Sequence, residues 1–111
     1  MQHDVKAFLY DIVQASRALE DFTQDLSFEA YKETPLVKAA VERKFIVIGE
    51  SLMRLREYSE WSDKISDSQK IIGFRNILVH GYDAIDDATV WSAIRENLPV
   101  LHREAKRLVE N

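Results

Sequence analysis

Residues 34–55 read TPLVKAAVERKFIVIGESLMRL, and this stretch decides the class of fold. Its larger apolar side chains recur at steps of three and four residues, at Val37, Val41, Phe45, Ile48, Leu52 and Leu55. This spacing predicts an amphipathic helix with one buried stripe. Thr34 is a favourable N-cap residue and Pro35 suits the first helical position, so we expect the helix to begin there. Gly49 costs it about 1 kcal/mol relative to alanine, and a close approach by a second helix is one way to recover that cost.

The same periodicity appears before this helix and is lost directly after it. A first helix is predicted over residues 3–26, where the apolar positions are Val5, Phe8, Leu9, Ile12, Val13, Ala15, Leu19, Phe22 and Leu26. Residues 27–31 are expected to form a connector or a short turn. The stretch 57–64 is polar apart from Tyr58 and Trp61, which is typical of a loop.

A third helix is predicted to follow this loop. Ser66 and Gln69 have the spacing of a capping box, which favours a helix start at Ser66. The helix should contain Ile71, Ile72, Phe74, Ile77, Leu78 and Val79. It should end near Gly81, because glycine is common just after the last helical residue.

The C-terminal third is predicted to hold one or two further helices. Asp86 or Asp87 would cap the fourth helix. Pro99 should kink or split that helix, with Asn97 as a new N-cap, because proline disturbs a helix interior. The whole chain would then form four or five amphipathic helices, which bury their apolar stripes most simply in an all-α, up-and-down bundle.

Length and composition narrow the possible functions. The chain has 111 residues, so we expect a single domain over residues 1–111. Its formal net charge of −4 disfavours a broad nucleic-acid surface, which is usually basic, but it leaves room for a small RNA-cutting cleft. The chain has no cysteine, and its three histidines lack the close spacing of a metal site, so we expect no metal and no other cofactor. No apolar run approaches the ~20 residues of a membrane span, and the N-terminus does not resemble a signal peptide, so we expect a cytoplasmic protein without a membrane segment.

Residues 75–82, RNILVHGY, carry the side chains with the most useful chemistry. At about 100° per helical residue, Asn76 and His80 lie about 100° and 140° from Arg75. The opposite arc holds Ile71, Phe74, Ile77 and Leu78. We therefore expect a polar front that carries Arg75, Asn76 and His80, and an apolar back.

Arg75 and His80 are suited to phosphoryl transfer. Arginine binds phosphate through two parallel hydrogen bonds, and histidine exchanges protons near neutral pH. RNA cleavage needs an activated 2′-hydroxyl, stabilised charge on phosphorus and a protonated leaving oxygen. One arginine and one histidine could supply some of these three functions. Two such pairs, facing each other across a dimer axis, could supply more of them. Spacing alone favours a solvated or hydrogen-bonded polar face that has no catalytic role.

Three blocks, in order, resemble the HepT-like proteins of the HEPN superfamily. VERKFIVIGES spans residues 41–51, IIGFRNILVHGYD spans residues 71–83, and VWSAIRENLPVL spans residues 90–101. The superfamily signature is an arginine followed four to six positions later by a histidine, and here it takes the form Arg75-x4-His80-x-Tyr82. The resemblance extends over nearly the whole chain, with no motif residue missing.

This resemblance implies a helical bundle that forms a homodimer, with the two motifs lining a shared cleft. It implies a metal-independent endoribonuclease that cuts mRNA or tRNA and acts as the toxin of a toxin–antitoxin pair. By this analogy Arg75 holds the scissile phosphate, His80 is the general acid or base, and Asn76 orients one of them. It also implies a partner, a minimal nucleotidyltransferase (MNT-type) antitoxin that can transfer AMP to Tyr82.

Several alternatives remain open at this stage. Glu50 could support the cleft by pairing with Arg75, but a surface pair with Arg54, four residues along, is the favoured interpretation. The basic run of His102, Arg103, Lys106 and Arg107 could contact RNA or the partner, and is also typical of a solvated helix end. Trp61 and Trp91 are expected to anchor the core or an interface. The chain as a whole could instead be a non-catalytic nucleotidyltransferase partner with Tyr82 as AMP acceptor, or a purely structural dimerisation bundle.

Overall fold

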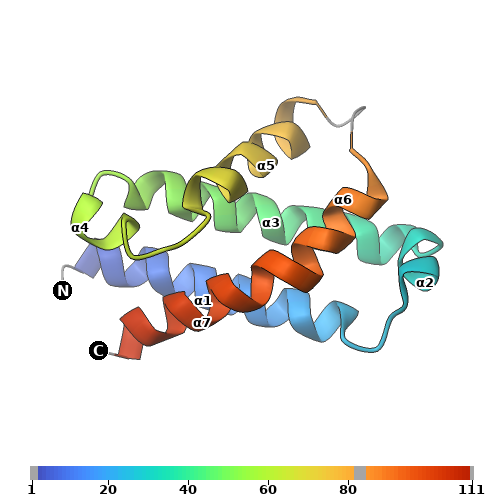
Figure 1. Ribbon diagram of the computed structural model, residues 1–111, viewed down its shortest axis with the longest axis horizontal. Helices are drawn as coiled ribbons and strands as arrows, with labels where there is room; N and C mark the ends of the chain where they lie inside the picture. Colours follow the sequence, from blue (N-terminus) through green and yellow to red (C-terminus); the bar gives the residue numbers. More distant parts are fainter. Residues whose placement is uncertain (1–2, 82–84, 111) are drawn as a thin grey trace.

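The computed structural model describes residues 3–81 and 85–110 (Figure 1). These residues form helices and connecting turns and contain no strand, which confirms the predicted all-α class. The elements are α1 (His3–Thr23), α2 (Phe28–Lys32), α3 (Pro35–Leu55), α4 (Ser59–Ser62), α5 (Ser68–His80), α6 (Asp87–Ser92), the π-helical turn η2 (Ala93–Asn97) and α7 (Leu98–Glu110). No helix among them is long and apolar enough to cross a membrane.

The long helical segments alternate in direction, as expected of an up-and-down bundle (Figure 1). Helix α1 packs against both α3 and α7, and α5 packs against α3. Most residues of the predicted apolar stripes fill the core, where Leu9, Ile12, Phe45, Ile48 and Leu101 are among the residues with at most 1% of their surface exposed. Phe22, predicted for the stripe of the first helix, is instead 40% exposed. The fold therefore attaches α5, the helix with the candidate motif, to the bundle mainly through α3.

The two segments predicted as a connector and a loop each contain a short helix. At α2, the Ser27 hydroxyl accepts a hydrogen bond from the Ala30 N–H at 3.1 Å. Helix α4 is a single turn within the expected loop. Thr34 occupies the predicted N-cap position of α3, with Pro35 next, but its hydroxyl donates to the Ala30 carbonyl at 2.6 Å instead of capping α3. Thr34 therefore joins α2 to α3.

The predicted capping box at Ser66 is wrong. The N-cap of α5 is Asp67, with a left-handed backbone at φ 60°. The Ser66 N–H and hydroxyl donate to the two carboxylate oxygens of Glu104 in α7, at 3.0 and 2.7 Å. A carboxylate 38 residues away in the sequence has taken the place of the local cap. The predicted end of this helix is confirmed, because the Gly81 N–H bonds the Ile77 carbonyl at 2.8 Å.

Pro99 does not split the last helix, and Asn97 is not an N-cap. Helices α6 and α7 are joined through η2, where the Leu98 N–H bonds the Ala93 carbonyl five residues back. Proline has no N–H and its ring clashes with the carbonyl four residues earlier in a regular helix. The wider π-helical turn just before Pro99 accommodates it without ending the helix.

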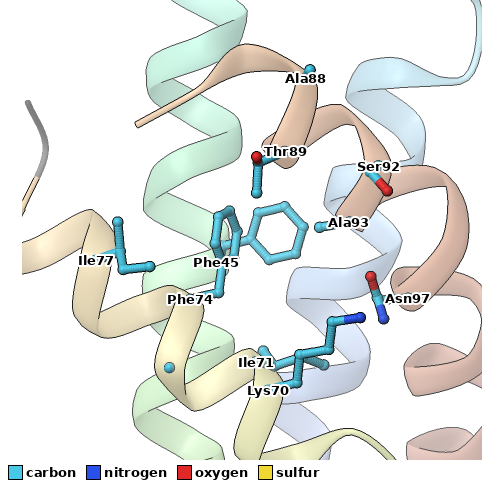
Figure 2. A pocket seen from close by; sticks show the side chains of 11 residues that line it. Phe45, Lys70, Ile71, Phe74, Ile77, Ala88, Thr89, Ser92, Ala93 and Asn97 are labelled. Carbon is cyan, nitrogen blue, oxygen red and sulfur yellow. The ribbon is translucent and has the colours of Figure 1, made fainter. Parts of the chain in front are cut away.

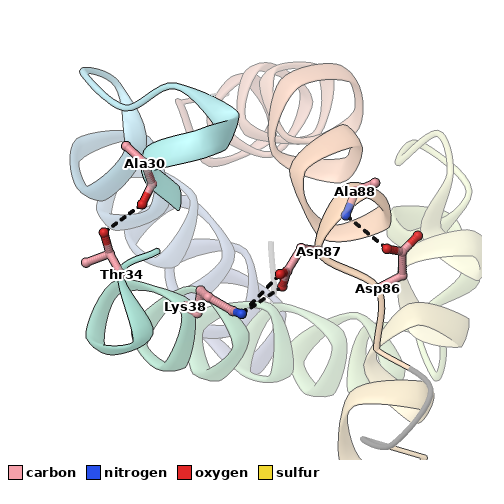
Figure 3. A network of polar contacts seen from close by, with 6 residues as sticks. All are labelled: Ala30, Thr34, Lys38, Asp86, Asp87 and Ala88. Carbon is pink, nitrogen blue, oxygen red and sulfur yellow. Dashed lines mark hydrogen bonds and ion pairs between the residues drawn. The ribbon is translucent and has the colours of Figure 1, made fainter. Parts of the chain in front are cut away.

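Asp86 caps α6, as predicted. Its carboxylate accepts from the Ala88 N–H at 3.3 Å (Figure 3). It also accepts from the Thr89 hydroxyl at 3.2 Å. We expect Asp86→Ala to lower the free energy of unfolding by about 1 kcal/mol, because the Ala88 N–H and the Thr89 hydroxyl lose their acceptor. Urea denaturation measures this change, with Asp25→Ala at an exposed position before α2 as control. Equal losses in the two variants would contradict the capping role.

Glu42 lies in a polar cluster between α3 and the start of α6. Lys38 in α3 pairs with the Asp87 carboxylate at 3.1 Å (Figure 3). Burial and, to a lesser extent, the Asp87 charge raise the pKa of Glu42 above its ordinary 4.5, although Lys38 opposes the shift. The fold therefore loses stability as the pH rises from 4.5 through the raised pKa, because Glu42 ionises more readily in the unfolded chain.

We expect Glu42→Gln to be more stable than the wild type at neutral pH, because the glutamine carries no charge to bury. Below pH 4.5 the gain should disappear, since Glu42 is then protonated in both the folded and the unfolded states. Urea denaturation across this pH range measures the difference, with Glu57→Gln at an exposed position as control. A gain independent of pH would show that another property of the substitution is responsible.

Candidate functional site

The candidate residues on α5 do not share one outward face. Asn76 and His80 are exposed, but the Arg75 side chain is only 16% exposed and lies at the junction with α3. The buried residues of α5 are Ser68, Ile71, Ile72 and Leu78. Ile77, predicted for the apolar back, is 47% exposed. The prediction that Arg75 stands on an exposed polar front with Asn76 and His80 is therefore wrong, because the helix is rotated to place Arg75 against α3.

Gly49 makes this orientation of α5 possible. A Cβ atom on Gly49 would lie 2.3 Å from the Arg75 Cβ and 2.5 Å from its Cγ, far inside van der Waals contact. Only a residue without a side chain lets the two helices approach so closely here. The sequence-based expectation of a close helix contact at Gly49 is confirmed. The arginine uses its apolar stem for packing, as long charged side chains often do, and carries its charged end to the edge of the junction.

Two neighbours hold the guanidinium of Arg75. Its Nη1 donates to the Asn76 side-chain oxygen at 2.9 Å, and its Nη2 donates to the Glu50 carboxylate at 3.4 Å. Its Nε is buried and has no hydrogen-bond partner among the described residues. Glu50 thus pairs with Arg75, and the favoured surface pair with Arg54 is wrong. Such a half-exposed ion pair adds little stability, and its main effect is to fix the direction of the guanidinium.

His80 stands in the last turn of α5, and its side chain is exposed. It lies five positions after Arg75, which corresponds to about 7.5 Å along the helix axis and about 140° around it. Within one chain the guanidinium and the imidazole therefore leave α5 on different sides. Tyr82, the expected AMP acceptor, lies outside the described residues.

A groove of about 590 Å³ lies beside the exposed side of α5 (Figure 2). Phe45 and Phe74 form its floor, with ring centroids 5.1 Å apart and ring planes at 81°. The rest is lined from α5 by Lys70, Ile71, Gly73 and Ile77, and from α6 and η2 by Ala88, Thr89, Ser92, Ala93 and Asn97. Sequence reasoning missed this groove because it assigned Phe74 and Ile77 to the buried back of the helix. A glycine in the helix interior at position 73 was the sequence feature that could have indicated the groove.

Among the other candidate residues, His102 and the two tryptophans have structural contacts. His102 contacts the Glu20 carboxylate of α1 through Nδ1, while Arg103, Lys106 and Arg107 are exposed. Trp91 packs on Tyr31 at 5.3 Å between ring centroids and anchors α6 to the core, as expected. Trp61 packs against the core edge. No group of three histidine, aspartate or glutamate residues in the described ranges is arranged to hold a metal ion.

Known proteins resemble this chain over almost its whole length. The sequence model described as "Ribonuclease HepT-like" matches residues 12–108. A protein of Methanocaldococcus jannaschii named "Putative RNase MJ1380" is 30% identical over 107 residues, which cover 95% of this chain and 96% of that protein. A protein of Thermococcus cleftensis named "Probable ribonuclease HepT" is 26% identical over 115 residues, covering 97% of this chain and 98% of that protein. No solved structure matches the chain significantly.

These matches, together with the all-α bundle and the Arg75–His80 helix, define the class of protein as a small helical protein of a ribonuclease family. The chain belongs to the HepT-like ribonuclease family. The resemblance inferred from its three sequence blocks is thereby confirmed.

Proposed function

We propose that this protein is a metal-independent endoribonuclease that cuts mRNA or tRNA, with Arg75 and His80 as its catalytic residues. The observation that carries the proposal is the fixed guanidinium of Arg75, seated on Gly49 and held by Glu50 and Asn76, on the same helix as an exposed histidine. An arginine restrained in this way can receive a phosphate with little loss of side-chain entropy. Family membership supports RNA as the substrate.

The reaction that suits these groups is an internal transfer at phosphorus. The 2′-oxygen of RNA attacks the adjacent phosphorus and loses its proton to a base, and the bond from phosphorus to the 5′-oxygen breaks. The leaving 5′-oxygen takes a proton from an acid. The products are a 2′,3′-cyclic phosphate and a 5′-hydroxyl. Arg75 would neutralise the charge that develops on the phosphoryl oxygens, and His80 would supply one of the two proton transfers.

A second copy of the chain would supply what one chain lacks. His80 and Arg75 leave α5 about 140° apart, so a partner across a two-fold axis can bring its own histidine to the other side of the substrate. Val79, one residue before His80, does not line the groove beside α5 and is 38% exposed, and this exposed apolar side chain supports such a contact. Sedimentation is expected to show a homodimer at micromolar concentration, and a persistent monomer would count against the shared cleft.

Two oligonucleotides that differ only in their sugars test the proposed chemistry. In the presence of a metal chelator, the protein should cut an all-RNA strand and leave 5′-hydroxyl ends. A strand of the same sequence with 2′-deoxy sugars should remain intact, because it lacks the attacking oxygen. Cleavage of both strands, or cleavage of RNA only after a divalent metal is added, would contradict the mechanism.

We also propose that a nucleotidyltransferase antitoxin of the MNT type is the partner of this protein, and that it modifies Tyr82 with AMP. The support is the Arg75-x4-His80-x-Tyr82 pattern, which places a tyrosine two residues after the catalytic histidine. Intact mass after incubation with the partner and ATP should show an AMP adduct, and Tyr82→Phe should show none. An unmodified wild-type chain would contradict this assignment.

A further inference from the structure

Gly49 and Gly73 lie inside long helices, and among the described residues only Gly49 is explained by packing. At Gly49 the absent side chain makes room for the Arg75 stem. At Gly73, in the middle of α5, an added Cβ would meet no described atom within 4 Å. A helix-interior glycine lowers helix stability relative to alanine. The described part of the chain therefore gains nothing from Gly73, although the glycine keeps one wall of the groove open.

The groove has the shape and chemistry of a small-molecule site. Its volume of about 590 Å³ falls in the range typical of ligand pockets. Part of the Phe74 ring is accessible at its floor. Ser92 and Asn97 stand on the side of α6 and η2, and Lys70 stands on the side of α5 (Figure 2). An apolar, aromatic floor with an amide, a hydroxyl and an ammonium group at the rim suits a flat nucleobase attached to a phosphate.

The groove lies next to the proposed catalytic face. Gly73 and His80 are seven residues apart, so they lie within about 20° of each other around α5. Ile77, in the groove wall, precedes His80 by about 4.5 Å along the helix. A strand whose phosphate lies at His80 can therefore place a neighbouring base at Ile77 and Gly73.

We propose that the groove between α5 and α6–η2 binds one base of the single-stranded RNA substrate, adjacent to the cleaved phosphate. This assignment rests on the proposed function and adds a base-binding subsite to it. A second copy of the chain is the competing occupant. The groove is lined by eleven residues, whereas a stable protein interface needs about 20–30 residues on each side. The size of the groove thus favours a base over a second protein.

Mononucleotide binding tests the subsite separately from cleavage. The probes are the four nucleoside 5′-monophosphates, titrated into the full-length protein and followed through backbone amide NMR signals. At least one nucleotide should shift the signals of Gly73 and Ala93. Gly73→Leu, which fills the groove, should weaken that affinity by about tenfold or more, as expected when a base loses its aromatic contact.

Gln69→Leu is the matched control, because it adds the same side chain to an exposed position of α5 that does not line the groove. It should leave the affinity unchanged. Neither variant should destabilise α5, since leucine has a higher helix propensity than glycine and about the same helix propensity as glutamine. Equal affinity of Gly73→Leu and Gln69→Leu, or no nucleotide binding by the wild type, would overturn the proposal.

The remaining outcomes distinguish a base from a second chain as the occupant of the groove. They also distinguish failure of the subsite from failure of the nuclease mechanism. If Gly73→Leu dissociates a dimer in sedimentation while nucleotide affinity is unchanged, the groove is a protein interface and the base-binding assignment is wrong. If nucleotides bind in the groove but the wild type cleaves no RNA, the subsite stands and the nuclease mechanism fails. If RNA is cleaved and no nucleotide shifts the groove signals, the mechanism stands and the subsite fails.

Discussion

His80→Ala is expected to cleave RNA about 10²- to 10⁴-fold more slowly than the wild type, the usual contribution of a positioned general acid or base. The imidazole is exposed at the end of α5 and makes no hydrogen bond within the described structure. Its removal should therefore leave the fold and the Tm unchanged. Initial rates on a labelled RNA strand measure the effect.

His3→Ala is the matched control, because it removes an exposed histidine at the start of α1. Its rate should equal that of the wild type. If His80→Ala cleaves RNA as fast as His3→Ala, the imidazole takes no part in the reaction and its assigned role is wrong.

Gly49→Ala is expected to damage both the fold and the activity. The new Cβ would lie 2.3 Å from the Arg75 Cβ and 2.5 Å from its Cγ. Either α5 must move away from α3, or the arginine stem must leave its position against Gly49. Overpacking of this kind typically costs about 1–3 kcal/mol. The guanidinium would also lose its position relative to Glu50 and Asn76, so cleavage should fall even under conditions where the variant is folded. Urea denaturation and initial rates measure the two effects.

Gly73→Ala is the stability control for this change, because it makes the same substitution in a neighbouring helix where no described atom lies within 4 Å of the new Cβ. It should raise the free energy of unfolding by up to about 1 kcal/mol through helix propensity. If both glycine variants are stabilised alike and Gly49→Ala keeps full activity, the close contact between α3 and Arg75 has no functional role.

Local signals in the sequence were sufficient to predict the positions of most of the helices. The stripe from Val37 to Leu55, the Thr34–Pro35 start and the Asp86 cap depend on neighbours within a few residues, and each lies where it was predicted. The cap expected at Ser66 failed because its partner is Glu104, a contact that exists only in the folded bundle. Pro99 was misjudged because the π-helical turn that precedes it has no simple sequence signature.

The candidate site was only partly predictable, for a related reason. The motif identified Arg75, Asn76 and His80 as residues of one helix, which the structure confirms. The rotation of that helix about its own axis depends on the helix that it touches. The missing side chain at Gly49 leaves room for Arg75 at the junction, and in this orientation of α5 Ile77 is exposed to solvent. Periodicity within α5 alone could not show this. The groove follows from the same rotation.

A double-mutant cycle on Arg75 and His80 tests the central claim, that the seated guanidinium and the imidazole act together on one RNA phosphate. Cleavage rates of Arg75→Ala, His80→Ala and the double variant are compared with the wild type, after circular dichroism has confirmed that all four proteins are folded. The effects of substituting residues that act as one catalytic unit are strongly non-additive. The double variant should therefore be about as slow as the slower single variant. Wild-type rates in both single variants, or losses that simply multiply in the double variant, would contradict the account.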